Sequence, residues 1–313
     1  MRALIFLILA AAACDDDSAP PAFDMTAAAN GDLSATPDLA PVVERGPFDV
    51  KLSFEPSGLW WDAPSQALYL ASTTNQISRW TDADGLSLFT TVPFALAPQT
   101  GDLGQLVRLA DGRLVVTVRG FGVNGNVVII ATDGTATAVP GLNQKRQRVG
   151  LTLAQDGTLY DGWFVGTGTM TPAGGLSKLD LSSGETDVLL GLSQPFGVLV
   201  SPTTLFAADQ KQSALVAMPL SNLDVDGGTT VKLASVTAPN YLCAGPGTDL
   251  FLTEAGVDRV TASGIITSFA SEPRRPSGVA YDADHGRLFV GDPDAKFDAD
   301  AGTTAAIHVL PVD

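Results

Sequence analysis

Short apolar segments alternate with turns rich in Gly, Asp and Pro along almost the whole chain. Residues 276–292, PSGVAYDADHGRLFVGD, show the repeating unit: an apolar strand, a tight turn, and a second apolar strand that ends in a carboxylate. Weaker copies begin at five earlier positions, namely Pro56, Leu103, Val149, Pro195 and Pro239. Alternation of short apolar runs with turn residues predicts strands rather than helices.

The copies recur at a nearly constant spacing. A glycine stands in the first strand of five copies and Tyr241 takes its place in the fifth: Gly58, Gly104, Gly150, Gly197 and Gly278. The intervals between these six positions are 46, 46, 47, 44 and 37 residues. A period of this length in a pattern of strands alone indicates an array of small sheets.

Each copy holds four predicted strands, except that the last copy ends one strand short. The missing strand is available at the other end of the chain, in residues 48–54 (FDVKLSF). After Gly278 come 35 residues and 11 run from Phe48 to Gly58, which together make 46, one full period. The sequence therefore predicts an all-β fold, a six-bladed β-propeller of four-stranded blades, closed by the strand at 48–54.

The N-terminus has the pattern of a targeting segment. Arg2 precedes an apolar run over residues 3–13, which is too short to span a bilayer and ends in Ala-Ala-Ala before Cys14. This pattern resembles the lipobox of bacterial lipoproteins, which implies a signal peptide at 1–13, a lipidated Cys14 and a location in the cell envelope. The usual Leu three places before the Cys is Ala11 here, and an ordinary secretory signal with a chance Cys is the alternative.

Residues 14–46 are rich in Ala, Pro and Asp without any periodic pattern. Such a segment buries too little apolar surface to fold, so we expect a disordered tether that could reach roughly 100 Å when extended. The folded domain is then expected to occupy 47–313. Cys243 lies in an apolar run and is expected to be a buried small hydrophobic residue, with no disulfide to a lipidated Cys14.

The formal net charge is −16, with only 18 Lys and Arg residues. Binding to a phosphate backbone needs a basic face, so nucleic acid is not an expected partner. An acidic surface is instead typical of a protein that must stay soluble outside the cell.

The stretches PSGVAYDADHGRLFVGD and TTNQISRW resemble the blades of NHL-repeat and senescence-marker-protein/gluconolactonase propellers, over roughly residues 48–313. In gluconolactonases, the resemblance implies a divalent metal at the mouth of the central channel, held by a Glu, two Asn and an Asp just before the first-strand glycines. The matching channel-mouth positions here are Ser57, Leu103, Val149, Phe196, Asn240 and Ser277.

These positions depart from the pattern that the resemblance implies. Ser57 stands in the Glu position, with Glu55 two residues earlier, and Val149 and Phe196 stand in the two Asn positions. Asn240 replaces the Asp and could coordinate a cation but could not act as a base. A metal would thus lose half of its ligands. A lactone hydrolase with a rearranged site, in which Glu55 points into the channel beside Asn240, is kept as the alternative function.

Acidic turns are the second place where Ca²⁺ could bind. The motifs DADG at Asp82, DVDGG at Asp224 and DPDAKFDADAG from Asp292 alternate Asp with Gly, but none completes a twelve-residue calcium loop. Turn-forming, solvated Asp is the expected role. The last motif is the best calcium candidate because it contains four carboxylates in one loop, Asp292, Asp294, Asp298 and Asp300.

The remaining polar features have simpler interpretations. Lys145, Arg146 and Arg148 are expected in a solvated loop, with contact to an anionic ligand as the alternative. Asp209 and Glu254, at strand ends, are expected to bond neighbouring backbone N–H groups. The G-x-G-x-x-G motif at 120–125 precedes a strand rather than a helix, so it is no dinucleotide site.

The sequence therefore predicts a monomeric binding or scaffold module, anchored to a membrane through Cys14, for a protein, peptide or glycan. No cofactor is expected, and the lactone hydrolase remains the alternative.

Overall fold

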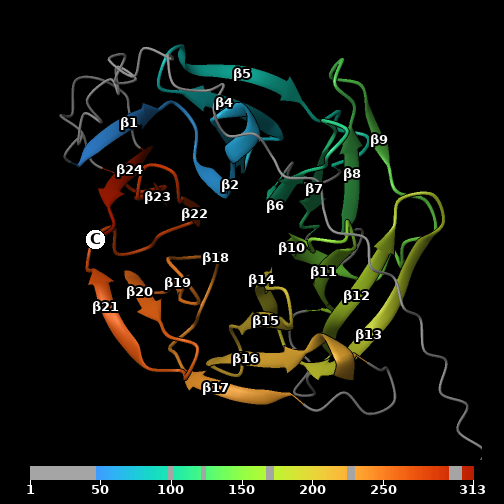
Figure 1. The fold of residues 1–313 in the computed structure, drawn as a ribbon. Coiled ribbons are helices and arrows are strands. Elements are labelled where there is room, and N and C mark those ends of the chain that lie inside the picture. The colour runs from blue at the N-terminus through green and yellow to red at the C-terminus, as the bar shows by residue number, and fades with distance from the viewer. Residues whose placement is uncertain (1–46, 98–101, 121–124, 167–172, 224–229, 296–304) are drawn as a thin grey trace, which may run out of the picture. The chain divides into compact units, whose positions relative to one another are not determined.

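The computed structural model describes residues 47–97, 102–120, 125–166, 173–223, 230–295 and 305–313. They form six antiparallel four-stranded sheets arranged around a central axis, as Figure 1 shows. The predicted six-bladed β-propeller is thereby confirmed. Cys14, the predicted signal peptide and the tether lie outside the described residues.

The blades follow the order of the chain, and each begins with the strand next to the axis, here called its inner strand. The first three are β2 (Pro56–Asp62), β3 (Ala67–Ser72), β4 (Gln76–Thr81) and β5 (Gly85–Thr91); β6 (Leu103–Arg108), β7 (Leu114–Val118), β8 (Asn126–Ile130) and β9 (Ala136–Ala138); and β10 (Gln147–Leu153), β11 (Leu159–Phe164), β12 (Gly174–Asp180) and β13 (Gly184–Leu192). The fourth and fifth are β14 (Pro195–Val200), β15 (Thr204–Asp209), β16 (Ala214–Pro219) and β17 (Val231–Ser235); and β18 (Leu242–Ala244), β19 (Leu250–Thr253), β20 (Val257–Val260) and β21 (Ile266–Ala270). The described residues contain only two short 3₁₀ helices, Ala63–Ser65 and Leu220–Asn222, and none of their helices is long and apolar enough to cross a membrane.

The sixth blade joins the two ends of the chain. It consists of β22 (Gly278–Asp282), β23 (Arg287–Asp292), β24 (Ala305–Pro311) and, as its outer strand, β1 (Phe48–Leu52). β1 pairs with β24 along its whole length, from Phe48 opposite Val309 to Leu52 opposite Ala305. In Figure 1 the blue β1 lies beside the red β24. The predicted closing strand is confirmed, two residues shorter than the predicted 48–54.

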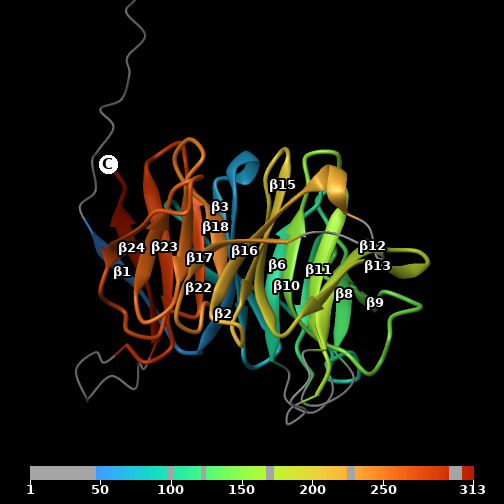
Figure 2. The ribbon, with the colours of Figure 1, turned by 90° about the horizontal axis from the view of Figure 1, so that it is seen from below.

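The hydrophobic core lies between the blades as six apolar layers. Five of the layers join the facing sides of two neighbouring sheets, and the sixth contains residues of blades 3 to 6. For example, Leu70 of blade 1 and Phe289 of blade 6 belong to the layer that closes the ring. Figure 2 shows the ring from the side: the blades lie next to one another, and their strands run from one face of the ring to the other. Both faces of every sheet are thus covered, which explains the long apolar runs in the inner strands.

The repeated glycines let neighbouring inner strands approach backbone to backbone. A Cβ atom added at Gly58 would collide with the carbonyl oxygen of Gly104 in the next blade, and one added at Gly104 would lie 2.5 Å from the carbonyl oxygen of Val149. At Gly278 the nearest atom would be Leu59 Cγ, at 3.1 Å. The glycines that repeat along the sequence therefore mark the positions where one inner strand contacts the next.

We predict that Gly58→Ala destabilises the protein by about 2–3 kcal/mol, because the added methyl group has only backbone in front of it and the blades must separate. Gly278→Ala is the matched control at the same position of blade 6, where the nearest atoms would lie at 3.1–3.3 Å instead of colliding and only a small shift is needed. Chemical denaturation would measure both free energies of unfolding. Equal losses in the two variants would contradict the explanation.

His308 ties three strands of the closing blade together. Its Nδ1 lies 2.7 Å from Asp49 Oδ1 on β1, and its Nε2 lies 3.1 Å from Asp292 Oδ2 at the end of β23. Burial lowers the pKa of His308, but the hydrogen bonds to Asp292 and Asp49 outweigh this effect, so the pKa is raised above its ordinary value of 6.5. Protonated His308 therefore stabilises the closed ring.

A raised histidine pKa makes stability depend on pH in a defined direction. The contribution of His308 is fully present below the unfolded-state pKa, near 6.5, and is lost as the pH rises through the higher folded-state value. We predict that the melting temperature falls between pH 6 and pH 9, and that His308→Gln removes this part of the fall. A pH profile that is the same in both proteins would disprove the assignment.

Candidate functional site: the two ends of the central channel

The six inner strands line a central channel with two different ends. We call the end where the inner strands begin the start face, and the end where they finish the end face. The predicted channel-mouth residues belong to the start face. In β2, β10 and β14 a β-bulge occurs there, between Pro56 and Gly58, Arg148 and Gly150, and Pro195 and Gly197. A bulge leaves one residue unpaired and redirects its side chain; here these residues are Ser57, Val149 and Phe196.

Apolar and aromatic side chains pack together at the start face. Val149, Phe196 and Tyr241 belong to one buried cluster, although they come from three different blades. Phe164 stacks on Phe196 with ring centroids 6.0 Å apart. Tyr241 stands where the other inner strands have glycine, so its ring adds bulk at the place where the chain elsewhere has none. Side chains rather than a polar cavity therefore occupy this part of the channel.

A partly buried ion pair borders this cluster. Arg119, which follows β7, lies 3.5 Å from Asp102, which precedes β6, and its guanidinium lies 5.0 Å from the centroid of Phe196. Burial raises the pKa of Asp102; Arg119 offsets part of this rise, and the charge of Glu55 adds to it. Burial also raises the pKa of Tyr241; the charge of Asp102 adds to this rise, and the charge of Arg119 opposes it. This mouth thus carries a guanidinium and a carboxylate, which sequence reasoning did not single out.

Glu55 and Asn240 are engaged with different partners. Glu55 is exposed and its Oε2 lies 3.5 Å from Thr73 Oγ1, whereas the Oδ1 of Asn240 accepts a hydrogen bond of 2.6 Å from Gln210 Nε2. The structure describes no contact between Glu55 and Asn240. The other three mouth residues differ in placement: Leu103 is buried in the apolar layer between blades 1 and 2, and the hydroxyl groups of Ser57 and Ser277 are buried without a described partner.

These residues do not fit the metal site that the resemblance implies. Leu103, Val149 and Phe196 have no donor atom, and the amide oxygen of Asn240 is already occupied. Hard cations such as Ca²⁺ need six to eight oxygen ligands. Among the described ranges, no group of three or more His, Cys, Asp or Glu residues is gathered closely enough to hold a metal.

The acidic loop predicted as a calcium candidate is described only in part. Asp292 contacts His308 and accepts a hydrogen bond of 2.9 Å from the backbone N–H of Asp294. The carboxylate oxygen Oδ2 of Asp294 lies 3.4 Å from Nη1 of Arg275. Asp298 and Asp300 lie outside the described residues. The two aspartates that are described thus interact with cationic or polar groups of the protein itself.

The carboxylates at strand ends have the predicted structural role. Asp209 is fully buried and accepts hydrogen bonds from the backbone N–H groups of Ser193 (2.7 Å) and Gln194 (3.0 Å). Glu254 accepts one from the N–H of Thr237 at 3.1 Å. The prediction for both residues is confirmed.

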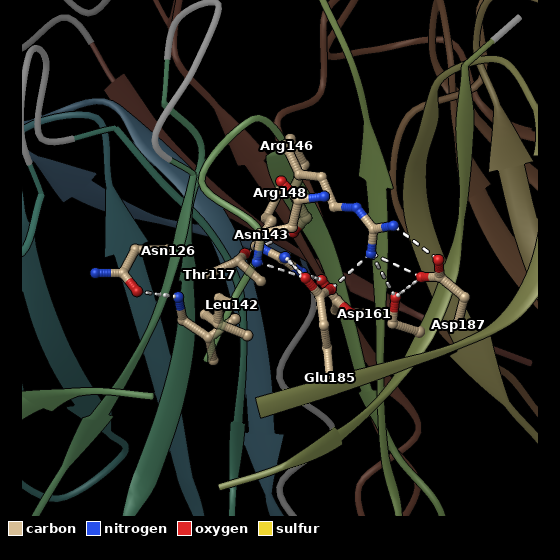
Figure 3. A network of polar contacts seen from close by, with 12 residues as sticks. Thr117, Asn126, Leu142, Asn143, Arg146, Arg148, Asp161, Glu185 and Asp187 are labelled. Atoms are coloured by element: carbon tan, nitrogen blue, oxygen red, sulfur yellow. Dashed lines mark hydrogen bonds and ion pairs between the residues drawn. The ribbon is translucent and has the colours of Figure 1, made fainter. Parts of the chain in front are cut away.

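The prediction of a solvated basic loop was wrong for Arg146 and Arg148. Lys145 is exposed, but Arg148 is fully buried and ion-pairs with Asp161 and with Glu185, the latter at 2.7 Å. Arg146 bridges Glu185 at 2.8 Å and Asp187 at 2.7 Å, as Figure 3 shows. The carboxylates come from β11 and β13 of the same blade, so only the strand pairing brings them next to β10.

Trp163 supports this network from one side. The guanidinium carbon of Arg146 lies 3.5 Å from the centroid of the Trp163 ring, a cation–π contact. Burial raises the pKa of Asp161 to about 6, although Arg148 opposes the rise. Burial raises the pKa of Glu185, but Arg148, the backbone N–H of Asn143 and Arg146 together outweigh this effect, so the pKa is lowered. The network thus consists of internal ion pairs of blade 3, and its two arginines are committed to protein carboxylates rather than to a ligand.

The end face of the channel contains a pocket. It has a volume of about 340 Å³ and is lined by residues of all six inner strands. Leu59, Leu106, Leu151, Val198 and Val279 form its apolar wall, each from a different blade. The predicted buried Cys243 lines it as well and is a free, half-buried thiol whose pKa is raised by burial.

Two polar side chains of this pocket, Gln105 and Thr152, are engaged with inner-strand backbone. Gln105 Oε1 accepts hydrogen bonds from the N–H groups of Leu151 (3.1 Å) and Val198 (3.0 Å), so it links three blades across the channel. Thr152 Oγ1 accepts one from the N–H of Val200 at 3.1 Å. Inner strands have an unpaired edge, and these side chains satisfy part of it.

The chain is similar in fold to known six-bladed propellers, but no protein-family model matches its sequence and no curated protein is significantly similar. A gluconolactonase from Xanthomonas campestris superposes with a TM-score of 0.66 at 16% identity, covering 84% of this chain and 89% of that one. Regucalcin, a calcium-binding protein from Agrobacterium tumefaciens, has a TM-score of 0.63 at 18% identity, and the match covers 84% of this chain and 96% of regucalcin. A luciferin-regenerating enzyme has a TM-score of 0.64 at 14% identity, and the match covers 85% of this chain and 95% of the enzyme. At such identities the likeness shows the fold alone.

We predict that Asp161→Ala destabilises the protein by about 3–5 kcal/mol, because it leaves the buried Arg148 with one partner fewer. Asp111→Ala is the matched control: it removes an exposed aspartate that ion-pairs with Arg113 at 2.7 Å, and such pairs contribute at most about 1 kcal/mol. Equilibrium unfolding in guanidinium chloride would compare the variants. Similar small losses in both would show that the network contributes little.

Proposed function

We propose that the protein is an extracytoplasmic binding module, anchored to a membrane through Cys14, that receives an apolar side chain of a peptide or protein partner in the pocket at the end face. The observation that carries this proposal is the contrast between the two channel ends. Val149, Phe196 and Tyr241 pack together where metal-dependent hydrolysis would need oxygen ligands. The opposite end holds an apolar pocket of about 340 Å³, within the range of ligand-binding pockets.

The chemistry of the pocket favours a peptide side chain over a glycan. Recognition of a sugar needs several hydrogen-bonding groups that are not yet used. Gln105 Oε1 and Thr152 Oγ1 already accept hydrogen bonds from backbone N–H groups, and the indole N–H groups of Trp60 and Trp61 are the buried groups of the lining without a described partner. The remaining wall is mostly aliphatic, with the rings of Trp60, Trp61 and Tyr281. Such a surface gains free energy by covering an aliphatic or aromatic group.

The charge of the end face supports a basic partner. Its turns carry exposed aspartates whose pKa is lowered by hydrogen bonds from nearby residues. A backbone N–H has the largest effect at Asp133 and Asp156, and the Ser182 side chain has the largest effect at Asp180. These groups stay ionised at neutral pH, in a chain of net charge −16. Lys or Arg residues beside the apolar side chain would therefore speed association and favour binding.

A lactone hydrolase is the second candidate, because a gluconolactonase is among the proteins of similar fold. Against it stand the apolar side chains of Val149 and Phe196 in the two Asn positions and the separate partners of Glu55 and Asn240. In this alternative, the chain would need oxygen ligands from elsewhere.

We predict that the peptide Lys-Lys-Trp-Lys-Lys binds the purified protein, that Lys-Lys-Ala-Lys-Lys binds at least tenfold more weakly, and that Glu-Glu-Trp-Glu-Glu does not bind. Ala283→Trp fills the rim of the pocket at an exposed position and should abolish binding. Fluorescence anisotropy of labelled peptides at two salt concentrations would measure this. The proposal would be contradicted if the Trp and Ala peptides bound with equal affinity and the Ala283→Trp substitution left that affinity unchanged.

The hydrolase alternative has a direct test with D-glucono-δ-lactone and millimolar Ca²⁺. Under the binding-module proposal, the protein leaves the spontaneous rate of acid release unchanged. Calcium-dependent turnover that Asn240→Ala abolishes would replace the proposed function with the hydrolase.

A further inference from the structure

The inner strand of blade 5 is the shortest of the six. β18 has three residues, whereas the other inner strands have five to seven. It ends at Ala244 because Gly245, Pro246 and Gly247 follow: Gly245 N–H turns back to the carbonyl oxygen of Asp249 at 2.8 Å, and Pro246 has no N–H to continue a strand. β18 is short at its beginning, since its end lies three residues after Tyr241, just as Leu153 and Val200 lie three residues after Gly150 and Gly197. The turn that follows β18 lies beside blade 4 at the end face.

A cleft of about 690 Å³ lies at this place, between blades 4 and 5. Leu199, Phe206 and Met218 of blade 4 line it together with Leu250 of blade 5. Val231 of β17 also lines it and is 57% exposed, the kind of solvent-facing apolar side chain that a bound ligand would cover. The cleft adjoins the channel pocket across Leu199, Val200 and Ala244, which line both.

The lining of the cleft is nearly uncharged. Among the described residues that line it, Asp249 alone is ionisable, and Arg259 Nε lies 2.7 Å from the Asp249 carboxylate. At the rim, the exposed residues Thr203 and Thr248 offer hydroxyl groups. An anionic ligand would find no positive lining group to replace its water, whereas a neutral polar end could bond to the threonines.

We propose that this cleft is a second binding site, separate from the channel pocket, for an elongated neutral apolar molecule of the class of fatty alcohols and acylglycerols. The apolar chain lies against Leu199, Phe206, Met218 and Leu250, and the neutral head group lies at Thr203 and Thr248. The volume suits a small molecule rather than a folded partner.

The test uses the neutral fluorophore N-phenyl-1-naphthylamine, which brightens in apolar surroundings, with the purified full-length protein. The expected result is saturable binding that dodecanol displaces at least tenfold more effectively than dodecanoate. Equal displacement by the anion would overturn the neutral character of the site, and a lack of saturable binding would overturn the site itself.

Two substitutions locate the probe. Ala217→Phe fills the cleft from β16, and Val231→Asp places a charge on its exposed wall; each should raise the dissociation constant at least tenfold. Val231→Asp changes an exposed side chain and keeps the test valid if Ala217→Phe fails to fold. Ala283→Trp, which blocks only the channel pocket, should leave binding unchanged.

The opposite pattern, loss with Ala283→Trp and retention with Val231→Asp, would place the probe in the channel pocket and overturn the proposal for the cleft. The peptide assay has a separate readout, so a failure of the cleft and a failure of the proposed function can be told apart.

Discussion

Backbone-to-backbone contact between neighbouring inner strands is the constraint on which the propeller depends. Gly58 and Gly104 each lack the Cβ atom that would push the next blade away. This contact draws six strands around a channel so narrow that a few side chains suffice to occupy it. Where Tyr241 replaces glycine, its ring joins Val149 and Phe196 in one cluster at the start face. Among the described residues, the side-chain bulk along the inner strands thus differs between the two ends of the channel.

Much of the fold could be predicted because it depends on local patterns. Strand and turn alternation, the period of the glycines and the missing strand at 48–54 gave the number of blades and the closure of the ring. The ionic network could not be predicted in this way. Arg146 and Arg148 look like a surface cluster in the sequence, and their partners Asp161, Glu185 and Asp187 follow only from the register of β10, β11 and β13.

The candidate site was predictable only at one of its two ends. The resemblance to lactonase propellers directs attention to the start face, where Ser57, Val149, Phe196 and Asn240 were singled out. The pocket at the opposite end has no motif, because every blade contributes one or two ordinary apolar residues to it. The cleft beside it has a weak signal, the Gly-Pro-Gly after Ala244, which reads as a simple turn until the neighbouring blade is in place.

The closure of the ring by β1 has a mechanical consequence. Residue 47 directly precedes this five-residue strand, so any tension that reaches the domain from the N-terminal side acts first on the pairing of β1 with β24. A pull would open the ring at this seam, expose the apolar layer around Phe289, and leave the other five blades with their strands intact. During synthesis β1 is made long before β24, so the ring can close only after β24 has been made.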